Sequence, residues 1–285
     1  MVLFPILGAL SKAIAEITER FVLMKEIIKT KQYQALQFLG ITILLAPLLF
    51  FFWKLDPEAL LWKNLLILLL IGIISIAANW FTFTSMKWQK LSKLEPAKMT
   101  EPLFVVVFVL IFSYIISPTI YERNLHSLIP AIIAALALIF SHVKKHHLEF
   151  NKYFIFALIG SFLYALELVF AKLILDFYSP VTMYFARSIL VLIGTIIVFR
   201  PNLFENLDKA TKLQIFLAAF MWVVYRLAIY YGYTSIGIVE TTLILLLAPI
   251  FVYIIAWKFL KEKLTWKNIV ASIVIVGCVV YATFI

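Results

Sequence analysis

Long apolar runs cover most of the chain, and short polar connectors separate them. The runs are continuous rather than alternating, which favours helices over the strands of a membrane barrel. Their length of roughly 20 residues fits the hydrocarbon core of a bilayer. We predict an all-helical membrane protein with ten spans: 2–24, 35–53, 64–86, 92–116, 127–142, 153–175, 180–199, 212–233, 238–260 and 268–285.

The same order of features occurs twice along the chain. An apolar run around Pro249 ends in the charged turn 261–265, and 147 residues earlier a run around Pro102 ends in the charged turn 121–125. One further apolar segment follows each turn. We interpret this as two five-helix repeats, residues 1–145 and 146–285, that form one membrane domain. Because five is an odd number, the second repeat enters the membrane from the opposite side, so the repeats are expected to be inverted.

Composition excludes the class of soluble globular domains. Hydrophobic residues make up 64% of the chain, charged residues 14%, and the mean hydropathy is +1.03. No Gly-rich phosphate cradle, Walker motif or nucleophile elbow occurs, so we expect neither an enzyme with catalytic residues nor a cofactor. Cys278 is the single cysteine and the four histidines are scattered, so no metal site is expected.

Basic residues are distributed unevenly between the connectors. Of the 25 lysines and arginines, 17 lie in connectors after odd-numbered spans or in the adjoining ends of spans, 3 on the opposite side and 5 deeper within spans. Because cytoplasmic connectors are rich in basic residues, this count places both termini outside the cell. The net charge of +10 then indicates contact with anionic lipid headgroups rather than with nucleic acid.

The residues around the second proline resemble a known family. Pro249, the turn 262–265 and Gly277 in the helix that follows look like the second repeat of the EamA-type transporters of the drug/metabolite transporter superfamily. Glu101 and Pro102 look like the Glu-Pro-Val of the first repeat. The resemblance implies a transporter in which the helix before each proline helix borders a central cavity. It also implies cytoplasmic termini, the opposite of what the lysines predict.

The equivalence of the two prolines places Arg226 opposite Asn79, both near the middle of a span that precedes a proline helix. Aromatic side chains surround both positions: Trp80, Trp222, Tyr225 and Tyr230. An arginine over aromatic rings can bind a carboxylate or phosphate or make a cation–π contact. We therefore assign these residues to a substrate site, with Arg226 holding an anionic group. The alternative is an Arg226 that is salt-bridged to a buried glutamate and serves packing.

Two glutamates, Glu16 and Glu167, lie in the middle of the first span of each repeat. Ionisable groups at membrane depth are retained where they face a cavity or a partner. Either carboxylate could match an ammonium group of the substrate or couple a proton. The alternative partners are Lys12 for Glu16 and Lys172 for Glu167.

The two proline helices differ most at their start. Glu95, Lys98 and Glu101 are three residues apart on one face of the fourth span, and their counterparts are nearly neutral: Thr242, Leu245 and Ala248. This asymmetry predicts two gates of unequal character, although a solvated charge at a helix end would give the same pattern.

Each proline deletes a backbone hydrogen bond, so kinks are expected at Pro102 and Pro249. Arg187, the cation of the seventh span, is assigned to a gate or to the cavity.

These interpretations converge on a secondary transporter in the cell membrane of a prokaryote. It would move a small polar or zwitterionic organic metabolite, similar to an amino acid, by alternating access. Its partners would be this substrate, membrane lipids and, as a candidate coupling ion, protons; it would act as a monomer or a homodimer. The alternative within the class is an exporter of cationic or lipophilic compounds. Alternatives from other classes are a membrane-embedded lipid-modifying enzyme and a scaffold without transport activity.

Overall fold

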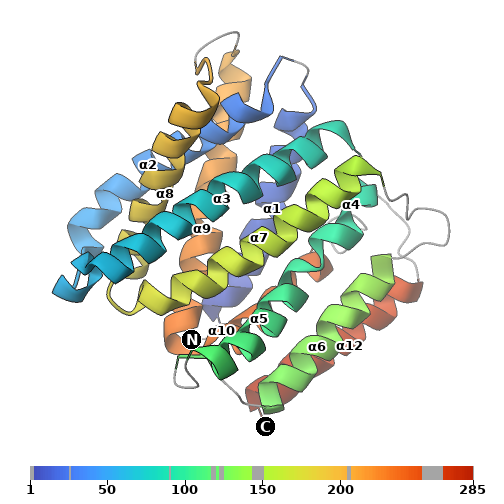
Figure 1. Ribbon diagram of the computed structural model, residues 1–285. Coiled ribbons are helices and arrows are strands. Elements are labelled where there is room, and N and C mark those ends of the chain that lie inside the picture. Colours follow the sequence, from blue (N-terminus) through green and yellow to red (C-terminus); the bar gives the residue numbers. More distant parts are fainter. Residues whose placement is uncertain are drawn as a thin grey trace.

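The computed structural model describes residues 3–25, 27–89, 91–116, 120–121, 125–142, 151–203, 207–251 and 266–284. Helices make up nearly all of these ranges (Figure 1). They are α1 (Leu3–Leu23), α2 (Thr30–Phe52), the short 3-10 helix η1 (Pro57–Leu60), α3 (Trp62–Trp88), α4 (Leu91–Lys98), α5 (Glu101–Ile115), α6 (Leu125–His142), α7 (Lys152–Leu175), α8 (Pro180–Phe199), α9 (Lys209–Ser235), α10 (Ile238–Leu245) and α12 (Trp266–Phe284).

Six helical segments in the described ranges are long and apolar enough to cross a membrane: Thr30–Phe52, Trp62–Trp88, Pro96–Ile115, Lys152–Leu175, Pro180–Phe199 and Lys209–Ser235. Three shorter apolar helices accompany them: His126–Ser141, Ile238–Phe251 and Trp266–Ala282. The first helix, α1, has sufficient length but carries four charged residues. The prediction of an all-helical, multi-pass membrane protein is confirmed at this level.

The fourth predicted span is two helices rather than one. α4 ends at Lys98 and α5 begins at Glu101, with a turn between them. The ninth span breaks in the same way, because α10 ends at Leu245 and helix resumes at Ala248. Residues 252–260 of that span lie outside the described ranges.

The kinks expected at the two prolines are therefore wrong. Pro102 lies in the first turn of α5, and Pro249 is the second residue of the helical segment that starts at Ala248. A proline in the first turn removes no helical hydrogen bond, since the N–H groups there have no intrahelical acceptor. The prolines thus follow the breaks and begin new helices.

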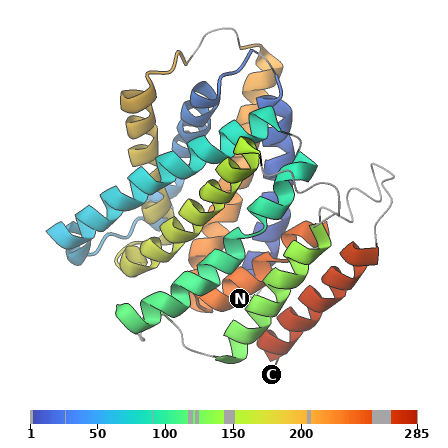
Figure 2. The same cartoon turned by 45° about the vertical axis from the view of Figure 1, so that its right-hand side comes forward.

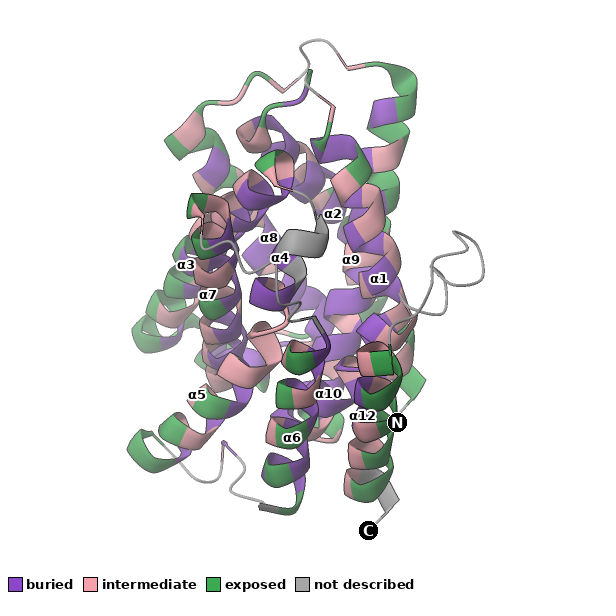
Figure 3. Ribbon diagram, turned by 90° about the vertical axis from the view of Figure 1, so that its right-hand side faces the viewer, coloured by how far each residue is buried: buried purple, intermediate pink, exposed green. Residues whose placement is uncertain are grey.

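The outer surface of the bundle is apolar. Phe50, Trp62 and Ile115 are 87%, 74% and 75% exposed, and Figure 3 shows exposed residues along the outward faces of the helices. Charged side chains such as Glu167 and Arg187 lie instead in the interior. An apolar exterior around a partly polar interior suits a protein whose solvent is lipid.

Helices distant in sequence pack side by side. α3 packs against α7, α1 against α9, α2 against α8 and α6 against α12 (Figures 1 and 2). Glycines allow close approach at two of these contacts. A Cβ atom at Gly8 of α1 would lie 2.8 Å from Ala228 Cβ of α9, and one at Gly160 of α7 would lie 2.3 Å from Thr82 Oγ1 of α3. The tight α1–α9 and α3–α7 pairs position the polar interior described next.

Candidate functional site

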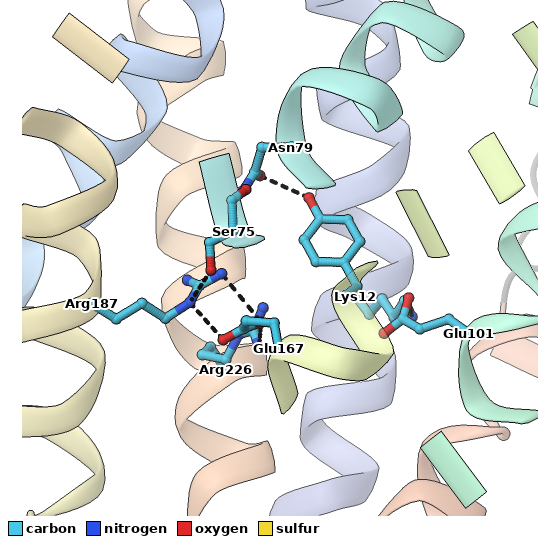
Figure 4. A network of polar contacts seen from close by, with 8 residues as sticks. Lys12, Ser75, Asn79, Glu101, Glu167, Arg187 and Arg226 are labelled. Atoms are coloured by element: carbon cyan, nitrogen blue, oxygen red, sulfur yellow. Dashed lines mark hydrogen bonds and ion pairs between the residues drawn. The ribbon is translucent and has the colours of Figure 1, made fainter. Parts of the chain in front are cut away.

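Two ion pairs cross between α1 and the broken helix α4–α5. Lys12 and Glu16 are one turn apart on α1, while Lys98 ends α4 and Glu101 begins α5. Lys12 Nζ lies 3.4 Å from Glu101 Oε2, and Lys98 Nζ lies 3.1 Å from Glu16 Oε1. α1 contributes the lysine of one pair and the glutamate of the other, so it is ion-paired to the helices on both sides of the break. Figure 4 shows the Lys12–Glu101 pair.

A small cavity lies beside these pairs. Its volume is about 20 Å³, which is room for about one water molecule. It is lined from α1, α3, α4, α5, α7 and α9 by Glu16, Glu19, Thr82, Phe83, Met86, Lys98, Glu101, Ser161, Tyr164 and Trp222. Three carboxyl groups and one lysine therefore share this lining.

Trp222 and Tyr225 of α9 contact side chains of α1 near the cavity. Trp222 Nε1 donates a hydrogen bond of 3.1 Å to Glu19 Oε2. The rings of Trp222 and Tyr225 pack edge to face, with centroids 5.3 Å apart. Lys12 Nζ lies 5.3 Å from the centroid of the Tyr225 ring, so its ammonium group has a cation–π contact as well as an ion pair.

A second cluster joins α7, α8 and α9 through the carboxylate of Glu167. Arg187 Nε lies 2.8 Å from Glu167 Oε1, and Arg226 Nη1 lies 3.0 Å from Glu167 Oε2. All three side chains are buried, Glu167 completely. The Arg187 guanidinium lies over the rings of Phe38 and Tyr184, and that of Arg226 lies over Tyr230. Two guanidinium groups share one carboxylate, which leaves the cluster with an excess positive charge.

Polar side chains of α3 connect the arginine cluster to the cavity (Figure 4). Arg187 Nε donates to Ser75 Oγ at 3.1 Å. Asn79, one turn further along α3, donates to the Ser75 carbonyl and accepts a 2.7 Å hydrogen bond from the Tyr164 hydroxyl. Tyr164 itself lines the cavity. The arginine cluster and the acidic cavity are therefore two ends of one buried network.

The alternative partners considered for the two mid-span glutamates are wrong. Glu16 pairs with Lys98 rather than with Lys12, and Glu167 pairs with two arginines rather than with Lys172. Lys172 instead forms an ion pair with Asp176, one turn further along. Sequence spacing favoured partners on the same helix, whereas the buried carboxylates find theirs across helix interfaces.

The other predicted site residues are divided between the cavity lining, the ion pairs and positions away from both. Arg226 has the geometry of the packing alternative, a salt bridge to a buried glutamate. Trp222 lines the cavity, and Tyr225 and Tyr230 contact the cations of Lys12 and Arg226. Trp80 packs against Phe81, Phe156 and Phe199 and is absent from the lining of the described cavity. The side chain of Glu95 lies outside the described residues.

Several residues of the cavity lining and of the adjoining polar network escape the sequence prediction. Glu19 was not among the predicted site residues, although it follows Glu16 by three positions and so shares its helix face. Ser75, four residues before Asn79, has the same relation on α3. Helical spacing from an assigned residue is the signal that finds both. The same signal finds Tyr164, three residues before Glu167, whereas Ser161 has none.

Residues 151–284 match the family model of the EamA-like transporter family. The second half of the chain therefore resembles this transporter family in sequence. The match runs from the start of α7 through α12 and agrees with the resemblance seen around Pro249 and Gly277. The family match and the apolar helices together support a multi-pass membrane protein of transporter type.

Two further comparisons concern the whole chain. No curated protein matches it. A solved crystal structure superimposes on this chain with a TM-score of 0.69 at 13% sequence identity, covering 99% of this chain and 94% of the other. At this identity the likeness shows a shared fold, which extends over both halves of the chain.

Proposed function

We propose that this EamA-type protein is a secondary carrier that moves a small zwitterionic metabolite, similar to an amino acid, across a prokaryotic cell membrane by alternating access. The observation that carries the proposal is the buried network with charges of both signs around the cavity. An ionisable group at membrane depth costs at least about 2.5–3.5 kcal/mol on insertion scales. A chain that retains seven of them together (Lys12, Glu16, Lys98, Glu101, Glu167, Arg187 and Arg226) is expected to use them.

The separation of charge within this network supports a zwitterion. Acids exceed lysines in the lining of the cavity, and arginines exceed acids in the cluster around Glu167. An ammonium group would lie toward the acids, and a carboxylate would accept hydrogen bonds from a guanidinium group. Asn79 and Tyr164, between the two ends, would bind the middle of the substrate.

The size of the cavity supports a cycle of opening and closing. A volume of about 20 Å³ admits one water, whereas ligand sites in proteins measure roughly 300–1,000 Å³. A metabolite would enter only when the surrounding helices separate. The crossed ion pairs between α1 and α4–α5 are the contacts that such a separation would break.

Two inverted repeats provide a physical basis for alternation, and helix positions support them. Shifted by 147 residues, the bounds of α3 become those of α9, and the break after Lys98 becomes the break after Leu245. Exchange of the repeats also converts the α1–α9 contact into the α7–α3 contact. Both contacts are present. A pair of repeats related in this way can expose one site alternately to either side.

The test is exchange of a mixed pool of amino acids and metabolites by the protein in liposomes. We expect flux of a zwitterion in wild type and loss of at least about 90% of it in Arg226→Gln. The matched control is Lys54→Gln, which removes a cation from the connector pair with Asp56 and should retain the flux. Undiminished flux in folded Arg226→Gln would remove this arginine from the site.

Export of cationic compounds is the second candidate, and the excess of acids in the cavity lining favours it. The same liposomes distinguish the two. Competition of zwitterion flux by amino acids but not by their decarboxylated amines supports the first candidate, because only the zwitterion has a carboxylate. Flux of amines alone, unaffected by Arg226→Gln, supports the second.

A further inference from the structure

Glu19 differs from the other acids of the cavity. Its side chain is 1% exposed and lines the cavity. Oε2 accepts the hydrogen bond from Trp222, whereas no hydrogen-bond partner among the described residues reaches Oε1. One oxygen of a buried carboxyl group that lines the cavity thus has no hydrogen-bond partner among the described residues.

The neighbouring acids are neutralised, and Glu19 is not. Glu16 has Lys98 and Glu101 has Lys12. Among the side chains that the structure describes, no lysine or arginine forms an ion pair with Glu19. The titratable and charged groups that face it are Glu16 of α1, Tyr33 of α2, Lys98 of α4 and Tyr164 of α7. Lys98, the single cation in this set, is already paired with Glu16.

An ionised Glu19 carboxylate, buried without a counter-ion, is energetically unfavourable. Burying a charge without a counter-ion costs several kcal/mol, and the cost disappears when one positive charge is added. The cavity limits which positive charge fits. About 20 Å³ holds one water, which leaves no room for a metal cation with a shell of oxygen ligands. A proton needs no additional volume.

We infer that Glu19 is the proton carrier of this transporter. In the closed, substrate-free protein the Glu19 carboxyl is protonated. When the ammonium group of a substrate enters, the O–H bond breaks, the proton passes to water, and the ammonium neutralises the carboxylate in its place. One proton leaves for each substrate bound, so the carrier works as an antiporter. The proton site stands on the geometry of Glu19, and the exchange step rests on the proposed function.

The first experiment needs no substrate. Trp222 Nε1 is hydrogen-bonded to the Glu19 carboxyl group, so loss of the Glu19 proton changes the environment of the indole ring. Tryptophan fluorescence of the purified protein, followed against pH, should show a step that is absent in Glu19→Gln and in Trp222→Phe. The chain has seven tryptophans, so Trp222→Phe assigns the signal. Glu58→Gln, an exposed acid of η1, is the matched control and should keep the step. A step that persists in Glu19→Gln, or no step in wild type, overturns the inference.

The second experiment separates this inference from the proposed function. With the membrane potential clamped, one-to-one exchange with protons accumulates substrate about tenfold per unit of pH gradient. Wild-type accumulation of this size supports the inference. Exchange of substrate that ignores the pH gradient overturns it and leaves the proposed carrier intact. Absence of flux for every substrate contradicts the carrier, and the fluorescence step still decides whether Glu19 holds a proton.

Discussion

The two broken helices share their geometry and differ in what surrounds the break. The break after Lys98 lies between two ion pairs with α1. The break after Leu245 has apolar surroundings, since Leu246 and Ala248 are buried and Leu245 contacts the hydrophobic core. The same backbone feature is therefore held by charge in one half of the chain and by apolar packing in the other.

If the two breaks act as gates, this difference would let them respond to different events. Ion pairs with little solvent around them exchange partners when another charge arrives, so a charged substrate or a proton can release the first break. Apolar contacts have no such competitor and depend on packed area alone. The first break would respond to ligand charge, and the second would follow the movement of the helices around it.

The strongest test places the charge of the first break into the second. Glu101 is followed by Pro102 as Ala248 is followed by Pro249, so Ala248→Glu gives the second break the acid that precedes the proline in the first. Ala248 is 5% exposed, and a carboxylate there would have no designed partner. We expect a loss of about 4 kcal/mol in the free energy of unfolding, measured by titration with sodium dodecyl sulfate in mild detergent.

Ala248→Gln controls for volume in this experiment. It adds a side chain of similar size without a charge and should cost about 1–3 kcal/mol. Equal losses in the two variants would mean that space, and not charge, distinguishes the breaks. Unchanged stability of Ala248→Glu would refute the description of the second break as apolar.

A smaller effect is expected from the reverse change, which removes one charge from the first break. Lys98→Met keeps the length of the side chain and leaves Glu16 without its lysine, at a cost of about 2–3 kcal/mol in the same unfolding assay. The matched variant is Leu245→Met at the equivalent position, which should cost less than about 1.5 kcal/mol because volume is conserved. Similar costs for the two variants would show that the Lys98–Glu16 pair contributes nothing special.

Much of the fold follows from the sequence, because lipid permits few solutions. A buried backbone must satisfy its hydrogen bonds within one helix, so apolar runs such as 180–199 fix α8 to the residue. The helix breaks after Lys98 and Leu245 could not be predicted from the sequence. Proline indicates that a helix is disturbed nearby, but whether it kinks a helix or begins one depends on neighbours that the run of apolar letters does not show.

The site follows from the sequence only in part, for a related reason. A charge within an apolar run marks a residue that needs a partner, which finds Glu16, Glu167, Arg187 and Arg226. The charge alone does not identify the residue that pairs with it. The pairs span 20 to 89 residues in sequence, so they depend on helix packing that local spacing cannot give.

The smallest expected effect concerns the Lys12–Glu101 pair, and it measures how much of the first break is electrostatic. A double-mutant cycle with Lys12→Met and Glu101→Gln isolates the coupling of the two charges. The side chains are 16% and 17% exposed, between the surface and the fully buried case, so we expect a coupling energy of about 1 kcal/mol.

The Lys54–Asp56 pair serves as the exposed control. It has a similar distance of 3.3 Å, but its side chains are 56% and 42% exposed. Its coupling should be a few tenths of a kcal/mol and vanish at about 1 M salt, where charges are screened within about 3 Å. The Lys12–Glu101 pair should keep most of its coupling energy at the same salt concentration. If both couplings disappear in salt, water reaches the first break freely, and charge no longer separates it from the second.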